Sequence, residues 1–124
     1  MIKYAPTHEY IRVEGSTGYV GISPYAAKQL GNIVYVEMPF ADDEFAAGEA
    51  FGAIESVKAA SDLFAPVACK VLETNEAVEA DPTVIGKDAL ANWIIQVEIT
   101  DPSELDSLMD QDSYDGFCAT EGNH

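Results

Sequence analysis

The alternation of apolar and polar positions along the chain predicts mostly short β-strands separated by turn residues. Two β-branched and aromatic runs, at 10–13 and 19–22, flank a glycine-containing turn and predict a hairpin. The clearest strand is predicted at 92–100, where Trp93 begins an alternating apolar series. Further extended segments are predicted at 32–38, 49–57, 62–67 and 70–75. The pattern therefore favours an all-β or mainly β domain.

A few segments change to helical spacing. Ser23 can cap a short helix, Pro24 suits its first turn, and Gly31 suits the position after its last turn. Short helical pieces are also predicted at 101–109 and at about 112–118, and the end at 119–124 is expected to fray. The expected architecture is thus a strand-rich core with short flanking helices and a C-terminal helix.

Charge excludes several classes of partner. The 124 residues include 48% hydrophobic positions, and 6 Lys and Arg stand against 22 Asp and Glu, giving a net charge of −16. A single domain over 1–124 is expected from this length. Such an acidic surface repels nucleic-acid phosphates and anionic membranes, so neither is an expected partner. No apolar run approaches the roughly 20 residues of a membrane span.

Cysteine and histidine are scarce. Cys69 and Cys118 are the only cysteines, and His8 and His124 are the only histidines. These numbers are too small for a disulfide scaffold or a Cys-rich metal site. We therefore expect no metal, and we expect both cysteines to be unpaired and non-catalytic.

The segment from Glu55 to Asp62 carries the most chemical information. Lys58 lies near its centre, with a serine and a carboxylate on each side and small residues between them. Extended segments approach from both directions, which predicts that Lys58 lies at a hairpin tip, where an enzyme can acylate its amine. The alternative is a solubilising lysine on an edge turn, and spacing alone does not separate the two.

Several motifs together resemble the glycine cleavage system H-protein family, in register from about Lys3 to Tyr114. The block Glu55-Ser56-Val57-Lys58-Ala59 matches the lipoylation motif of that family. Lipoyl domains of 2-oxo acid dehydrogenases usually have Asp-Lys-Ala instead, and biotin carriers have Met-Lys-Met. Other matching segments lie at 4–10, 21–23, 31–36 and 101–105.

The resemblance implies that Lys58 carries lipoate in amide linkage and that the protein is a carrier without turnover of its own. In the family, a pyridoxal-phosphate glycine decarboxylase loads an aminomethyl group, and a tetrahydrofolate-dependent aminomethyltransferase removes it. An FAD-containing dihydrolipoyl dehydrogenase then reoxidises the arm, which a lipoyl ligase or transferase originally attached. The implied fold is a barrel-sandwich hybrid of two small antiparallel sheets, and the implied state is a monomer.

The resemblance also implies a cleft that holds the loaded arm. The matching positions are Thr7, Glu9 and Asp62, whose hydroxyl and carboxylates would accept the three donors of an ammonium group. Without the resemblance, a turn role for Thr7 and solvated carboxylates at the other two positions are the simpler interpretations. Ala68-Cys69 departs from the Ser-Gly turn common in the family. Because a cysteine at positive φ is strained, we expect this turn to differ.

Several alternatives stay open on sequence alone. Asp106-Ser107-Leu108 is the phosphopantetheine triplet of acyl carrier proteins, although those proteins are helical bundles. A lipoyl donor for 2-oxo acid dehydrogenases and an unmodified interaction module are two further alternatives. The Tyr4-Ala5-Pro6 and Phe117-Cys118 segments favour the mitochondrial matrix, with a bacterial cytoplasm as the alternative.

Overall fold

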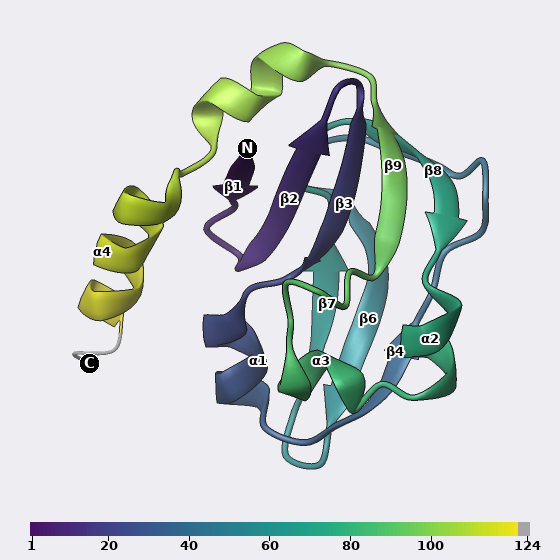
Figure 1. Cartoon of the computed structure of the whole chain (residues 1–124), viewed down its shortest axis with the longest axis vertical. Helices are drawn as coiled ribbons and strands as arrows, with labels where there is room; N and C mark the ends of the chain where they lie inside the picture. Colours follow the sequence, from purple (N-terminus) through teal and green to yellow (C-terminus); the bar gives the residue numbers. More distant parts are fainter. Residues whose placement is uncertain (122–124) are drawn as a thin grey trace.

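The strands pair into two antiparallel sheets, seen in a computed structural model that describes residues 1–121 (Figure 1). Within that range the first sheet contains, in spatial order, β1 (Ile2–Tyr4), β2 (Glu9–Glu14), β3 (Thr17–Ile22), β9 (Ile95–Ile99), β8 (Cys69–Thr74) and β5 (Glu44–Phe45). The second sheet contains β4 (Ile33–Glu37), β6 (Ala50–Ser56) and β7 (Ala60–Phe64). The predicted mainly β class and the two sheets are confirmed.

Short helices surround the sheets. They are α1 (Pro24–Leu30), α2 (Glu76–Ala80), α3 (Val84–Lys87), the 3-10 helix η1 (Pro102–Ser107) and α4 (Gln111–Glu121). The predicted caps of α1 are present, since the Ser23 side chain accepts a hydrogen bond from the Ala26 N–H and Gly31 has a φ of 77°. No helix within residues 1–121 is long and apolar enough to cross a membrane.

Side chains from both sheets form one buried cluster. Ile11, Val20, Val71 and Val97 contribute from the larger sheet, and Ile54 and Leu63 contribute from the smaller one. Burial of each such aliphatic side chain stabilises the fold by roughly 1.5–3 kcal/mol. The core therefore holds the small sheet against the large one and fixes the position of the β6–β7 hairpin.

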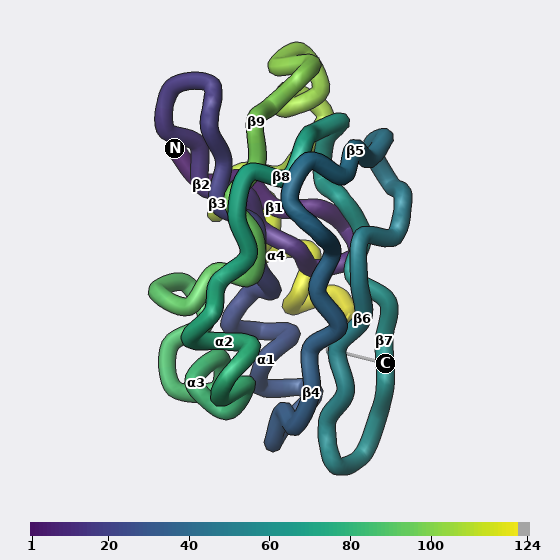
Figure 2. The backbone as a smooth tube through the Cα atoms, turned by 90° about the vertical axis from the view of Figure 1, so that its right-hand side faces the viewer, coloured from purple at the N-terminus to yellow at the C-terminus, as the bar shows by residue number. Residues whose placement is uncertain are grey.

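The β6–β7 hairpin projects from one end of the molecule. Glu55 pairs with Ala60 at the base of its turn. Figure 2 shows this turn at the bottom of the view, beside the start of β4, and Ile33 at that start pairs with Ser56. The tip thus rests on two paired strands, although residues 57–59 themselves lie outside any strand.

The simple alternation expected across 49–57 is wrong at one point. Phe51 and Ile54 are both buried, because the register between β6 and β7 shifts between Ala50 and Gly52. Such an irregularity changes the side of the sheet to which the following residues point. Strict period-2 counting does not detect it.

Other element boundaries also differ from the prediction. The strand expected at 62–67 is β7, which begins at Ala60, and the strand expected at 92–100 begins only at Ile95. The helix at 101–109 is a 3-10 helix, and α4 extends to Glu121, so 119–121 is helical rather than frayed. The remaining positions, 122–124, lie outside the described residues. The elements β1, β5, α2 and α3 were not predicted from the pattern.

The turn before β8 holds Ala68 and Cys69 without positive φ at either residue. His8 and Asp42 are the non-glycine residues with positive φ among those described, so Ala68 and Cys69 adopt ordinary backbone angles. Cys69 begins β8 and is buried. A cysteine in place of the glycine common in the family therefore causes no backbone strain at position 69.

Candidate functional site

Lys58 lies at the tip of the β6–β7 hairpin with its side chain exposed. Within residues 1–121, its ammonium takes part in no ion pair. The side chain passes Gly31, where an added β-carbon would lie 3.4 Å from Lys58 Cε and 3.8 Å from Nζ. Because Gly31 has no side chain, it leaves this side of the Lys58 side chain uncovered.

Ser56 fixes the backbone of the tip. Its hydroxyl accepts hydrogen bonds from the Lys58 N–H at 3.3 Å and from the Ala59 N–H at 3.1 Å, and it donates to the Ala59 carbonyl at 3.2 Å. The Ser56 N–H donates to the same carbonyl at 2.7 Å. A small hydroxyl side chain at this position thus satisfies the turn locally and presents Lys58 outward.

The other residues of the predicted modification motif surround the tip. Glu55, Val57 and Ala59 are exposed, and the Val57 N–H donates to the Asn32 carbonyl at 3.0 Å. This bond ties the tip to the segment just before β4. The motif residues therefore form one accessible surface around Lys58. Backbone hydrogen bonds of Val57 and Ala59, on either side of the lysine, hold this surface in place.

A cavity of about 390 Å³ lies beside β7. Its lining comes from the turn before β2, from α1, from β6 and β7, and from the end of α4. The lining includes all three residues that the resemblance implies for the arm, namely Thr7, Glu9 and Asp62, together with Tyr25, Gln29, Ser61 and Glu121. Residues far apart in the sequence thus meet in one polar-edged cavity.

Glu9 is the buried acid of this cavity. It is 2% exposed, and its carboxylate accepts hydrogen bonds from the Thr7 hydroxyl and from the Phe64 N–H, the latter at 3.3 Å. Burial raises the pKa of Glu9 to about 7, although the hydrogen bonds from Thr7 and Phe64 oppose this shift. Near neutral pH the carboxyl can therefore be neutral, or ionised when a cation lies beside it.

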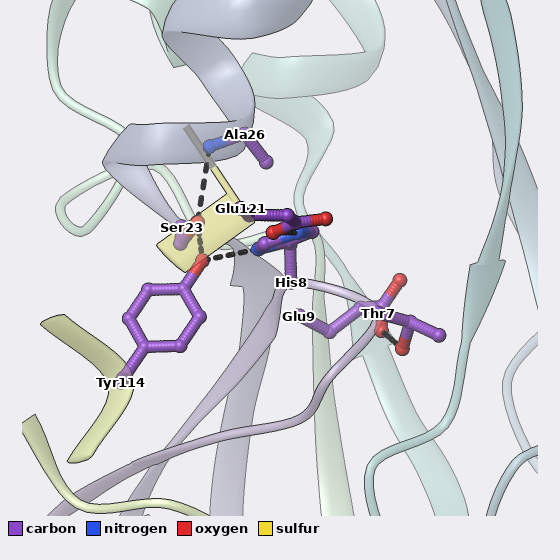
Figure 3. A network of polar contacts seen from close by, with 7 residues as sticks. All are labelled: Thr7, His8, Glu9, Ser23, Ala26, Tyr114 and Glu121. Atoms are coloured by element: carbon purple, nitrogen blue, oxygen red, sulfur yellow. Dashed lines mark hydrogen bonds and ion pairs between the residues drawn. The ribbon is translucent and has the colours of Figure 1, made fainter. Parts of the chain in front are cut away.

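A polar network joins two lining residues of the cavity, His8 and Glu121, to Tyr114 and Ser23 (Figure 3). The Tyr114 hydroxyl lies 2.6 Å from His8 Nδ1 and 2.6 Å from the Ser23 hydroxyl. His8 Nε2 lies 2.9 Å from the Glu121 carboxylate. Burial raises the pKa of Tyr114, so its hydroxyl stays protonated and donates within the network. The network fastens α4 to the turn that carries Thr7 and Glu9.

Glu121, another lining residue, was missed by sequence reasoning. Its position depends on where α4 packs, and no neighbouring motif indicates such a position. The stacked rings of Tyr4 and Tyr114, whose centroids lie 4.2 Å apart, help to hold α4 against β1. Contacts between residues 106 or more positions apart give no local signal in the sequence.

The described residues give little support for a metal site, a nucleophilic cysteine or a phosphopantetheine attachment site. Among residues 1–121, no group of three or more His, Cys, Asp or Glu is arranged to hold a metal ion. Burial raises the pKa of Cys69 to about 11, so its thiol is a poor nucleophile. Ser107 ends a 3-10 helix and donates to the Glu104 carbonyl at 2.8 Å, a setting unlike the helical bundle of an acyl carrier protein.

A family model and the proteins of similar sequence carry the same description. A family model described as "Glycine cleavage H-protein" matches residues 2–121. The chain is 51% identical over 118 residues to the glycine cleavage system H protein of Alkaliphilus oremlandii, covering 95% of this chain and 93% of the relative. It is 46% identical over 122 residues to the protein of that name from Carboxydothermus hydrogenoformans, covering 98% and 94%.

A solved structure agrees with the fold. The crystal structure of a glycine cleavage system H protein from Mycobacterium marinum superimposes with a TM-score of 0.84 at 33% sequence identity. The match covers 93% of this chain and 94% of the other. Both sheets and their flanking helices therefore follow an arrangement that is already known in an experimental structure.

Proposed function

The chain belongs to the glycine cleavage H-protein family, and from this membership we propose that Lys58 is the residue on which it carries lipoate. The protein is a lipoyl carrier of the glycine cleavage system and has no turnover of its own. It moves the aminomethyl group of glycine from the decarboxylase to the aminomethyltransferase, and then passes electrons to the dehydrogenase. The exposed amine of Lys58, free of any ion pair within residues 1–121, carries the assignment.

The remaining lysines are less suitable anchors. Lys70 lies 3.7 Å from the Asp42 carboxylate, and Lys3 is half-buried in β1. Lys28 and Lys87 lie in the last turns of helices rather than at a hairpin tip. Lys58 therefore combines exposure, support of its backbone by Ser56 and a position just before β7, the strand whose Ser61 and Asp62 line the 390 Å³ cavity.

The residues around the cavity fit an acylated lysine that ends in a cation. When bound, the lipoyl group supplies a dithiolane that takes up the aminomethyl group and later gives up electrons. Glu9 and Asp62 supply carboxylates and Thr7 supplies a hydroxyl, all of which can accept hydrogen bonds from an ammonium group. A cation beside Glu9 favours its ionised form, and burial keeps bulk water away from that carboxylate.

The finer details of the biological setting are also part of the proposal. The partners are a pyridoxal-phosphate glycine decarboxylase, a tetrahydrofolate-dependent aminomethyltransferase, an FAD-containing dihydrolipoyl dehydrogenase and a lipoyl ligase or transferase. The carrier acts as a monomer, with 1–124 as one lipoyl-bearing domain. The relatives are bacterial, which fits the alternative of a bacterial cytoplasm and gives no support to the mitochondrial matrix.

Intact-mass measurement after incubation with a lipoylating enzyme tests the assignment. The wild type and the Lys28→Arg control should each gain one lipoyl group, whereas Lys58→Arg should gain none. The modified wild type should then support glycine-dependent CO₂ exchange with the decarboxylase, an activity that a pure lipoyl donor would lack. Modification of Lys58→Arg to the wild-type extent would refute Lys58 as the anchor.

A further inference from the structure

Apolar side chains are exposed next to the Lys58 tip. Val34 is 48% exposed, Tyr35 is 50% exposed and Val57 is 70% exposed. We call these three residues the tip patch. The other large apolar side chains that are exposed within residues 1–121 are Met1, Phe40 and Leu72. Three of the six exposed large apolar side chains within residues 1–121 therefore lie near Lys58.

A β-bulge places two of the three residues on the same side of β4. Ile33 pairs with Ser56, but Tyr35 pairs with Glu55, so Val34 is an extra residue in the ladder. Ile33 is buried, whereas Val34 and Tyr35 are both exposed. The bulge thus presents two consecutive apolar side chains outward, where regular alternation would have presented one.

The tip patch is continuous with the modification site. Val57 directly precedes Lys58, and its N–H bond to the Asn32 carbonyl holds the tip against the start of β4. Glu55 pairs with Tyr35 on one side and with Ala60 on the other. An apolar surface, a carboxylate and the lysine are therefore held in one fixed arrangement.

Protection of a sheet edge does not explain this arrangement. Strand β4 is an edge of the three-stranded sheet. Edge strands are usually protected from pairing with other chains by charged residues, especially lysine, or by proline. Val34 and Tyr35 instead increase the apolar area of the edge, which favours contact with another protein.

We propose that the tip patch is the docking surface for the enzyme that lipoylates Lys58, an inference that rests on the proposed function. A lysine side chain extends only about 6 Å beyond its backbone. An enzyme that acylates the free amine must therefore touch the hairpin itself. Enzymes that act on the far end of a lipoyl arm need not approach the hairpin so closely. Contact at the tip thus favours the lipoylating enzyme over the later partners.

Charge indicates the chemistry of the partner surface. Glu37 lies two positions after Tyr35 on the exposed side of β4, and Glu55 lies opposite Tyr35. The expected partner surface has an apolar centre for Tyr35 and Val57 and a basic rim for these carboxylates. In the reaction, the deprotonated Lys58 amine forms an amide bond with the acyl carbon of an activated lipoyl donor. The bond from that carbon to the leaving group breaks, the leaving group departs with its electron pair, and the nitrogen releases one proton to solvent.

Lipoylation kinetics test the docking surface. A lipoate ligase with lipoate and ATP is used as the probe, and transfer is followed by intact mass. Tyr35→Ser and Val57→Ser should each lower kcat/KM about tenfold, mainly through KM. Leu72→Ser removes an exposed apolar side chain from β8 in the other sheet and should stay within about twofold of the wild type. Denaturation curves must show that all the variants are folded.

Two outcomes would overturn the inference. Wild-type kcat/KM in folded Tyr35→Ser and Val57→Ser would remove the patch from ligase recognition. The variants are also lipoylated to completion with excess ligase and assayed for glycine-dependent CO₂ exchange, where near-wild-type rates are expected. An equal loss in both assays would contradict a docking surface devoted to lipoylation. Failure of the wild type to be modified would instead refute the proposed function itself.

Discussion

Gly52 in β6 lies so close to the Glu37 carbonyl oxygen in β4 that an added β-carbon would stand 2.2 Å from that oxygen. The contact involves backbone, so no side-chain rotation can relieve it. Gly52 also follows the register shift that allows both Phe51 and Ile54 to be buried. The absence of a side chain at this position is therefore a condition for pairing β4 with β6.

We expect Gly52→Ala to destabilise the protein by about 3 kcal/mol, because β4 must move away from β6. Urea denaturation measures this change. Gly86→Ala is the matched control, since a β-carbon there meets nothing within 4 Å and the site lies in α3. The control should be neutral or up to about 1 kcal/mol more stable. Equal stabilities for the two variants would contradict the close approach.

The buried carboxyl of Glu9 makes stability depend on pH. Burial raises its pKa from 4.5 to about 7, so between these values the folded protein holds a proton that the unfolded chain releases. The contribution of Glu9 to stability is complete below about pH 4.5 and is lost as the pH rises through 7. The total loss is on the order of 3 kcal/mol.

Glu9→Gln removes this titration. We expect the stability of the variant relative to the wild type to rise by up to about 3 kcal/mol between pH 5 and pH 8. Urea denaturation at several pH values gives the difference. Glu73→Gln, at an exposed position of β8, is the matched control for the change of side chain. A constant difference for Glu9→Gln would show that Glu9 does not titrate in this range.

The Tyr114 hydroxyl is shared by His8 and Ser23, so its loss should loosen α4. Tyr114→Phe keeps the ring stacked on Tyr4 but leaves a buried hydrogen-bond network without its central member. We expect a loss of about 1–3 kcal/mol and faster amide hydrogen exchange in α4. Tyr4→Phe removes a hydroxyl bonded to exposed Gln111 and should have the smaller effect. The reverse order would argue against the network.

Ser56→Ala should slow lipoylation while leaving the fold intact. The variant loses the bonds from the Ser56 hydroxyl to the backbone of Lys58 and Ala59, so the tip samples more conformations. We expect kcat/KM for lipoyl transfer to fall a few-fold and stability to fall by about 1 kcal/mol. Ser61→Ala is the control at the mirror position, where the hydroxyl donates only to the Asp62 carbonyl. Identical rates for both variants would exclude a positioning role for Ser56.

Local signals predicted much of the fold. The β2–β3 hairpin follows from its apolar runs and from Gly15, whose φ is 64°, and α1 follows from Ser23 and Gly31. Strands β1 and β5 were missed because they are very short and are defined by partners elsewhere in the chain. The bulge at Val34 also depends on its partner strand, because a one-residue shift in pairing has no signature in composition.

The candidate site divides in the same way. The exposed position of Lys58 at a tip was predicted from the small residues and strands around it and is confirmed by the structure. Thr7, Glu9 and Asp62 were named only through a family resemblance, and the structure brings them into one cavity. Glu121 could not be predicted, because its position there depends on the tertiary packing of α4 on β1.

Strand β7 links the hairpin tip to the cavity, so under the proposed function its length sets how far a group tethered on Lys58 must reach to enter the cavity. Lys58 and Asp62 are separated by four positions, roughly 13 Å of extended chain. Lengthening both β6 and β7 by two residues would preserve which side chains face inward, yet would move the anchor away by about 7 Å. Such a protein should still be modified but should leave its cargo open to hydrolysis. Hairpin length would then be under selection independently of the lysine motif.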